Sequence, residues 1–205
     1  KCPFCDTPIE KEEDAVDHFC PNRRCPERVL RSIGFFVSRA AMDIDGMAQR
    51  TVQALIDGGF IQDESDIFYL PAEPLLELEG FGEKKVENLL ASIDAARKRP
   101  LWQLITSLGI DGVGSTVAQL LTDRFRSIEA LSFASAETIE EIEGIGPILA
   151  QNVVEWFADE DNAHLLEKMK NAGVNMQAAE RVMAGNELDG QTFVLTGTLP
   201  TMSRK

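Results

Sequence analysis

Four cysteines near the start of the chain have the spacing of a metal site. Two short-spaced pairs, C-x2-C and C-x4-C, flank a fourteen-residue loop and hold all the cysteines of the chain: Cys2, Cys5, Cys20 and Cys25. Such pairs can bring four thiolates to one tetrahedral zinc ion and leave no coordination position open for water. The spacing therefore predicts one structural zinc site. Metal binding would supply much of the folding free energy of this segment, which has few apolar residues.

Two other arrangements of these thiols stay open on spacing alone. The cysteines can form two disulfides, which a cytosolic setting disfavours, or they can hold an iron–sulfur cluster. His18 offers another ligand atom, but with four thiols at hand we expect it on the surface.

A second chemical pattern is a glycine-centred turn that recurs four times. The first glycines are 34, 32 and 32 residues apart, within residues 44–48, 78–82, 110–114 and 142–146. Each turn reads apolar, acidic, glycine, apolar, then glycine or, once, alanine. Such a turn lets the backbone approach a ligand without an intervening Cβ, and a helix directly after it presents free N–H groups and a partial positive charge. A phosphate suits this site, and phosphates are the same at every base.

Each turn must therefore lie at the mouth of a helix. Apolar residues follow the first glycine at +6 and +9, and in three repeats at +13, so they share one helical face. We expect the central apolar residue of each turn to pack inward and the acid to turn back toward backbone amides. The +6 and +9 residues are Val52, Leu55, Val86, Leu89, Ala118, Leu121, Ala150 and Val153, and the +13 residues are Ile93, Phe125 and Phe157.

The four turns differ in the residues directly after them. Lysines come after Gly82 and hydroxyl residues come after Gly114, which makes these two turns the best candidates for contact. A positive φ at either glycine would add to the need for glycine there. Gly146 is followed by Pro147, which has no N–H to donate. In the first turn Ala48 replaces the second glycine, so that turn can have a different conformation. The candidate phosphate-binding residues are Gly46, Arg50, Gly80, Gly82, Lys84, Lys85, Gly112, Gly114, Ser115, Thr116, Gly144 and Gly146.

The composition is that of a folded, soluble and acidic chain. With 44% apolar and 26% charged residues, a chain of 205 residues can bury an ordinary core. It contains neither an apolar stretch near the ~20 residues of a membrane span nor a signal-peptide pattern, so we expect a cytoplasmic protein without membrane contact. The formal charge of −14 limits phosphate binding to a restricted surface, and basic residues gather at 23–31, 84–85 and 97–99.

In its order of segments the whole chain resembles the C-terminal half of bacterial NAD-dependent DNA ligases. Residues 36–46, 78–90 and 108–114 look like that family's first three hairpin segments, and the short strand pattern at 193–199 looks like the opening of its BRCT domain. The resemblance implies a mainly α fold: a zinc finger at 1–30, four helix-hairpin-helix motifs at 31–180, and a linker with a truncated start of an α/β BRCT domain at 181–205. That last segment is too short to fold as a BRCT domain.

The resemblance also implies a function. The family transfers AMP from NAD to the lysine of a Lys-x-Asp-Gly motif, then to a 5′ phosphate at a nick, and finally joins the strands. No lysine here has Asp-Gly in that position, so we expect no catalytic residue in this chain. NAD and Mg²⁺ would bind the missing N-terminal adenylation and OB-fold domains. This chain would be a DNA-binding clamp, without base specificity, that encircles nicked duplex DNA in replication and repair, in the bacterial nucleoid.

Three alternatives remain beside that function. The first is a helix-hairpin-helix subunit of a repair nuclease or of a junction-binding protein. The second is a protein-docking scaffold, and the third is a helical repeat array whose glycine turns bind nothing. A Lys-x-Asp-Gly domain upstream would favour the ligase.

Overall fold

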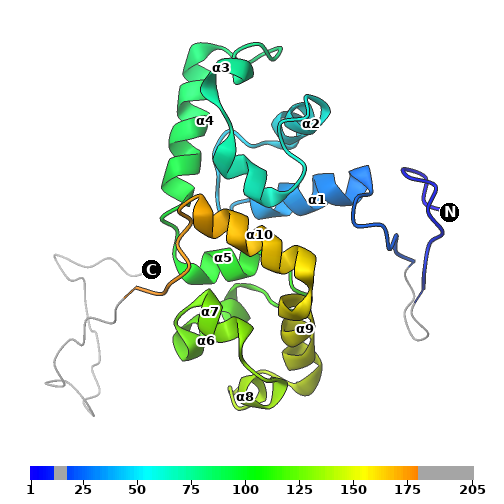
Figure 1. Ribbon diagram of the computed structural model, residues 1–205, viewed down its shortest axis with the longest axis vertical. Helices are drawn as coiled ribbons and strands as arrows, with labels where there is room; N and C mark the ends of the chain where they lie inside the picture. Colours follow the sequence, from blue (N-terminus) through cyan, green and yellow to red (C-terminus); the bar gives the residue numbers. More distant parts are fainter. Residues whose placement is uncertain (12–17, 180–205) are drawn as a thin grey trace, which may run out of the picture.

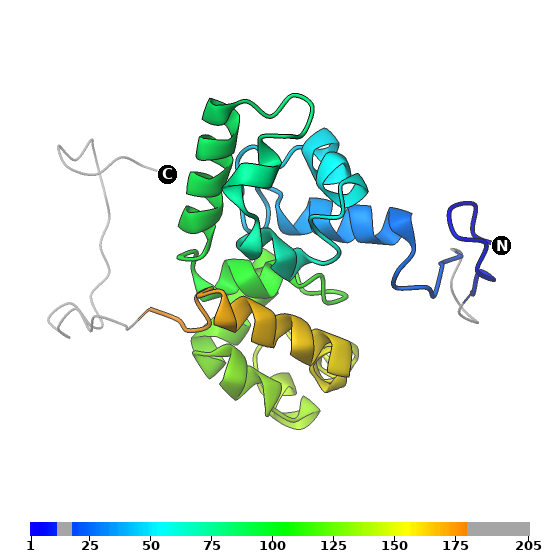
Figure 2. The same cartoon turned by 45° about the horizontal axis from the view of Figure 1, so that its top comes forward.

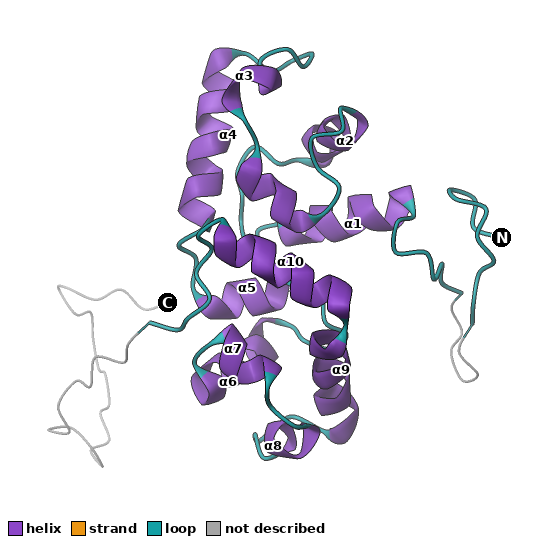
Figure 3. Cartoon of the chain, viewed as in Figure 1, coloured by secondary structure: helices purple, strands orange, loops and turns teal. Residues whose placement is uncertain are grey.

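The computed structural model describes residues 1–11 and 18–179, and within them the chain is almost entirely helical (Figure 1, Figure 3). Outside the helices the described residues hold two isolated β-bridges and no sheet. The predicted mainly α fold is confirmed, while the BRCT start falls outside the described residues. The elements are α1 (Pro26–Phe36), α2 (Gln49–Asp57), the 3-10 helix η1 (Glu64–Tyr69), α3 (Ala72–Leu75), α4 (Glu83–Ala96), α5 (Leu101–Ser107), α6 (Ser115–Phe125), α7 (Ile128–Ser132), α8 (Ala136–Glu140), α9 (Pro147–Ala158) and α10 (Glu160–Asn171).

Each glycine turn joins two helices that pack against each other. The four helix pairs are α1 with α2, α3 with α4, α5 with α6, and α8 with α9. All the +6 and +9 residues named above are buried, and Ile93 at +13 is buried as well, while Phe125 and Phe157 pack against the core from its edge. The helical periodicity of the sequence is thus confirmed in every repeat.

The repeats associate in two pairs, because a turn of one repeat rests on the second helix of its neighbour. A Cβ at Gly46 would lie 3.5 Å from Leu89 Cδ1 of α4. A Cβ at Gly112 would come within 2.9 Å of Leu149 Cδ1 of α9. The first turn therefore packs on the second repeat, and the third turn packs on the fourth.

Helix α10 ties the two pairs of repeats together (Figure 1, Figure 2). The Lys168 ammonium of α10 lies 2.7 Å from Asp63 Oδ2 and 2.9 Å from Asp66 Oδ1, at the start of η1. Tyr69 at the end of η1 donates a hydrogen bond of 2.8 Å to the Lys168 carbonyl. Partial burial acts to raise the pKa of Asp63, but hydrogen bonds from Lys168 and Ser65 hold it below its ordinary value.

The linker between α4 and α5 lies at the same junction. Arg97 donates to the carbonyls of Phe68, at 2.7 Å, and of Ala172. Arg99 donates to the Asp43 carboxylate at 2.7 Å. The basic cluster at 97–99 is therefore largely structural, since two of its three cations are spent on contacts within the fold. No helix of the described residues has both the length and the apolar character to cross a membrane.

Candidate functional site

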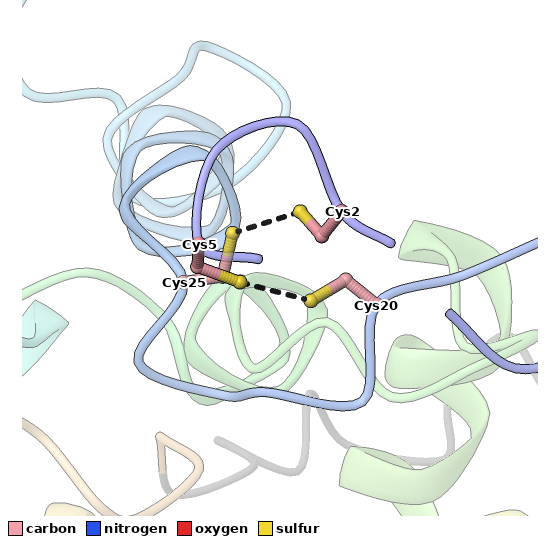
Figure 4. A group of neighbouring side chains, drawn as sticks. All are labelled: Cys2, Cys5, Cys20 and Cys25. Atoms are coloured by element: carbon pink, nitrogen blue, oxygen red, sulfur yellow. Dashed lines mark hydrogen bonds between the residues drawn. The ribbon is translucent and has the colours of Figure 1, made fainter. Parts of the chain in front are cut away.

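The four cysteine sulfurs converge on one point (Figure 4). All four Sγ atoms lie within 4.8 Å of one another, with 3.8 Å between Cys2 and Cys25 and 3.5 Å between Cys5 and Cys20. Around a tetrahedral zinc ion with sulfur at about 2.3 Å, neighbouring sulfurs lie about 3.8 Å apart. The cysteines are unpaired, and their sulfurs are far beyond the ~2.05 Å of a disulfide bond. The donor set and its spacing fit a single zinc ion.

Short backbone contacts hold the cysteines in place. The Cys2 N–H donates to the Thr7 carbonyl at 2.8 Å, and the Asp6 N–H donates back to the Cys2 carbonyl at 3.0 Å. This knuckle needs the left-handed backbone of Asp6, with φ 58°. Cys25 is the residue from which α1 begins, and Arg28 one turn later donates to the Cys20 carbonyl at 2.7 Å. The second pair of ligands is therefore built onto the first helix of the repeats.

The thiols differ in acidity before any metal binds. In its thiolate form Cys5 accepts a hydrogen bond from the Thr7 hydroxyl, 3.2 Å away, which lowers the pKa of Cys5 to about 6. Desolvation raises the pKa of Cys20 to about 12. A zinc ion would hold both as thiolates, so metal binding must release protons.

The four hairpin turns share one backbone conformation. The first glycine has a positive φ in every turn: 88° at Gly46, 78° at Gly80, 77° at Gly112 and 93° at Gly144. The residue at the second glycine position is extended, with a negative φ, in all four turns. The need for glycine on backbone grounds therefore lies at the first position, and the idea of a positive φ at Gly82 or Gly114 was wrong.

The first turn follows the same geometry despite its alanine. Ala48 has φ −62° and ψ 157°, in the same extended region as Gly82 with φ −79° and ψ 164°. An alanine fits there because no left-handed conformation is required. The alanine therefore does not change the conformation of the first turn, although the sequence had allowed for a different one.

The central apolar residues of the turns are buried, whereas the acidic residues are exposed. Met47, Phe81, Val113 and Ile145 are all buried, as the sequence predicted. The acids just before the first glycines, Asp45, Glu79, Asp111 and Glu143, are exposed, and in the described part of the chain their carboxylates accept no hydrogen bond from a backbone amide. The expectation that these acids turn back to the backbone was wrong.

The polar candidates are only partly free. Lys84 pairs with Glu87 at 2.8 Å, and the Lys85 ammonium lies 3.7 Å from the centre of the Phe81 ring and 3.2 Å from the Gly80 carbonyl. Arg50, by contrast, is exposed and makes no ion pair or hydrogen bond within residues 1–11 and 18–179. Ser115 and Thr116 are exposed at the start of α6. An exposed cation without a partner in residues 1–11 and 18–179 thus stands beside the first turn, as cations and hydroxyl groups stand beside the second and third.

The starts of the hairpin helices are bare. At α2, α4, α6 and α9 no side chain caps the first turn. Among the other helices of the described chain, η1, α7, α8 and α10 are capped by the side chains of Asp63, Ser127, Ser135 and Asp159. Helices α1, α3 and α5 also lack a side-chain cap and have a proline at their first residue or directly before it. Each of the four glycine turns therefore leads into a helix start whose amide groups meet no capping side chain.

The cysteine segment and the third and fourth glycine turns both match models of known protein families. Residues 1–26 match the model of the NAD-dependent DNA ligase C4 zinc finger domain, and residues 103–166, which include the third and fourth turns, match the helix-hairpin-helix motif. The four cysteines are thus a zinc-binding cluster.

Curated relatives align along the entire chain. It is 46% identical over 207 residues to a DNA ligase of Roseiflexus sp. (strain RS-1), 45% to one of Chloroflexus aggregans over 206 residues, and 38% to one of Thermosipho africanus over 205 residues. All of this chain is covered in each alignment, but only 28%, 30% and 31% of the respective relative. The chain therefore spans less than a third of these relatives, and its resemblance to the DNA ligases is confirmed.

Proposed function

We propose that this chain is the portion of an NAD-dependent DNA ligase that grips nicked duplex DNA without regard to base sequence. The observation that carries this proposal is that all four glycine turns lead directly into a helix whose first turn has no capping side chain. A helix start without a capping side chain presents amide donors and a partial positive charge, which suit a phosphate oxygen.

The second glycines support an external ligand. A Cβ at Gly82, Gly114 or Gly146 would meet no atom within 4 Å, and each residue has a negative φ. Nothing within the described fold thus demands glycine at these positions. A phosphate approaching the amides would favour a very small residue there, because a bulky side chain would stand between the turn and the phosphate.

The contact surface then comprises the turns at Gly46, Gly80, Gly112 and Gly144. Arg50 supplies a free cation at the first turn, Lys84 and Lys85 can exchange their internal partners for a phosphate at the second, and Ser115 and Thr116 supply hydroxyl donors at the third. The fourth turn is the weakest phosphate site, since Pro147 lacks an N–H. With a formal charge of −14, the rest of the surface repels DNA.

The whole enzyme, in this proposal, joins nicks in replication and repair with NAD and Mg²⁺ bound by its adenylation and OB-fold domains, in the cytoplasm at the nucleoid. The zinc finger covers residues 1–30 and the helix-hairpin-helix domain residues 31–180, with 181–205 leading into a BRCT domain. Helix α1 crosses the limit between the first two, so the same helix belongs to both.

The test is a titration of the zinc-loaded chain with nicked duplex. Gly82→Val and Gly114→Val should each weaken binding by about tenfold, the effect of one lost charge-assisted hydrogen bond. Gly146→Val is the matched control, with the same open space and backbone, and should weaken binding less. Circular dichroism verifies that all three variants remain folded. If Gly146→Val weakens binding most, the choice of contact turns is wrong, and if the unaltered chain binds no duplex, the proposed function fails.

A further inference from the structure

The fourth hairpin carries an apolar side chain where the other three carry polar ones. Two residues beyond the second glycine position stand Arg50, Lys84, Thr116 and, in the fourth repeat, Ile148. Ile148 is 80% exposed, although isoleucine is among the residues most often buried. Its neighbour Leu149 packs against the third turn, whereas the exposed side chain of Ile148 contributes little to the core.

Single exposed apolar residues are common on proteins, so exposure alone says little. The repeat register adds the second observation. The fourth turn has the same backbone as the others, with φ 93° at Gly144 and φ −94° at Gly146. Side chains on a helix tilt toward its N-terminus, so the second residue of α9 projects toward the hairpin. Among the exposed large apolar residues of the described chain, Ile148 alone occupies this position.

The fourth turn has also lost phosphate-binding chemistry. Pro147 removes one amide donor, and Ile148 replaces a cation or a hydroxyl. The apolar surface of a duplex comprises the thymine methyl groups of the major groove and the deoxyribose carbons that line the minor groove. Only the deoxyribose carbons recur at every base, as binding without base specificity requires. We propose that the fourth hairpin binds the duplex through Ile148, which packs against the sugars of the minor groove, while the other hairpins bind phosphates. This inference rests on the proposed function and assigns a different chemistry to one of its four turns.

Salt dependence separates the two kinds of contact. Each neutralised phosphate contributes about 0.9 to the log–log salt slope of the binding constant, whereas an apolar contact contributes nothing. Ile148→Ala should weaken binding of nicked duplex roughly three- to tenfold at every salt concentration and leave the slope unchanged, for a contact that covers on the order of 30–60 Å² of apolar surface. Arg50→Ala should instead lower the slope by about 0.9.

Two further variants make the test decisive. Ile148→Lys places a cation in the register of Lys84, so the slope should rise by about 0.9 if this position faces the duplex. Phe133→Ala removes a side chain that is 84% exposed but lies outside the hairpin register, and should leave binding unchanged. The inference is overturned if Ile148→Ala binds like the unaltered chain, if its slope changes, or if Ile148→Lys leaves the slope alone. Unchanged binding by Gly82→Val and Gly114→Val would count against the proposed function instead, whatever the Ile148 variants do.

Discussion

Arg23 and Asp159, 136 residues apart, join the cysteine-bearing segment to α10, the last helix of the described residues. Arg23 Nη1 lies 2.9 Å from Asp159 Oδ1 and Nη2 lies 2.7 Å from Oδ2, which makes a two-point contact between guanidinium and carboxylate. The same carboxylate caps α10 by accepting hydrogen bonds from the amides of Asp161 and Asn162. The hydrogen bond from Arg23 holds the pKa of Asp159 below its ordinary value. The Asp159 carboxylate thus both binds Arg23 of the zinc finger and caps α10.

Replacing this carboxylate separates its two tasks. Asp159→Ala should lower the free energy of unfolding by about 1 kcal/mol, the usual effect of losing an N-cap. Asp159→Ser keeps a capping oxygen and loses only the ion pair, so it should cost much less, because Arg23 is 54% exposed and such pairs contribute little. Urea unfolding of both variants measures the difference. Equal losses would show that the ion pair, and not the cap, is the larger contribution.

Metal analysis should find one zinc ion per chain. Cys20→Ser should abolish tight zinc binding and disorder the finger, because a structural zinc supplies folding free energy that three thiolates cannot replace. The helices from α2 onward have their own core, so the helical circular dichroism should be largely retained. Native mass spectrometry with and without a chelator provides the measurement. Two disulfides and no metal would contradict the assignment.

Lys168 should stabilise the fold over a broad pH range. Lys168→Met leaves Asp63 and Asp66 without their cation and should cost about 1–2 kcal/mol at neutral pH, since hydrogen bonds to charged groups contribute in this range.

The pH dependence of this loss follows from both partners. The folded pKa of Asp63 is lowered, so its contribution is present above an unfolded pKa of about 3.9 and is lost as pH falls through the lowered folded value. Burial acts to lower the pKa of Lys168, but hydrogen bonds to Asp63 and Asp66 raise it, so its contribution is present below about pH 10.4 and is lost above. Urea unfolding from pH 3 to 11 should therefore show the two proteins converging at both ends. A gap that widens in acid would refute this account.

This chain should form no covalent adduct with AMP. Its sequence has no Lys-x-Asp-Gly segment to supply the nucleophile. Incubation with NAD labelled in its adenylate, followed by denaturing electrophoresis, should leave the chain unlabelled, with a full-length ligase as the positive control. Label on this chain would mean that a nucleophile had been overlooked.

The sequence foretold the features that depend on local chemistry. The cysteine spacing, the positions of the turns and the apolar helix faces were all visible, because each follows from neighbours within one element. The pairing of repeats was not visible, since the contact of Gly112 with Leu149 depends on tertiary packing. Arg97 and Arg99 looked like surface charges because nothing local distinguishes a cation that binds distant carbonyls. Ala48 misled for the opposite reason, as only the dihedral angles show which glycine the turn requires.

The position of Arg97 bears on whether this repeated sequence is modular. A cut between α4 and α5 would fall at the cation that serves Phe68 in one half and Ala172 in the other, and the amide of Asn175 donates to the Arg97 carbonyl at 2.8 Å. Either piece would expose carbonyls and apolar surface that the other now covers. The four similar units of the sequence therefore fold as a single unit. A shortened or duplicated array would have to keep the contacts of Arg97 with both halves.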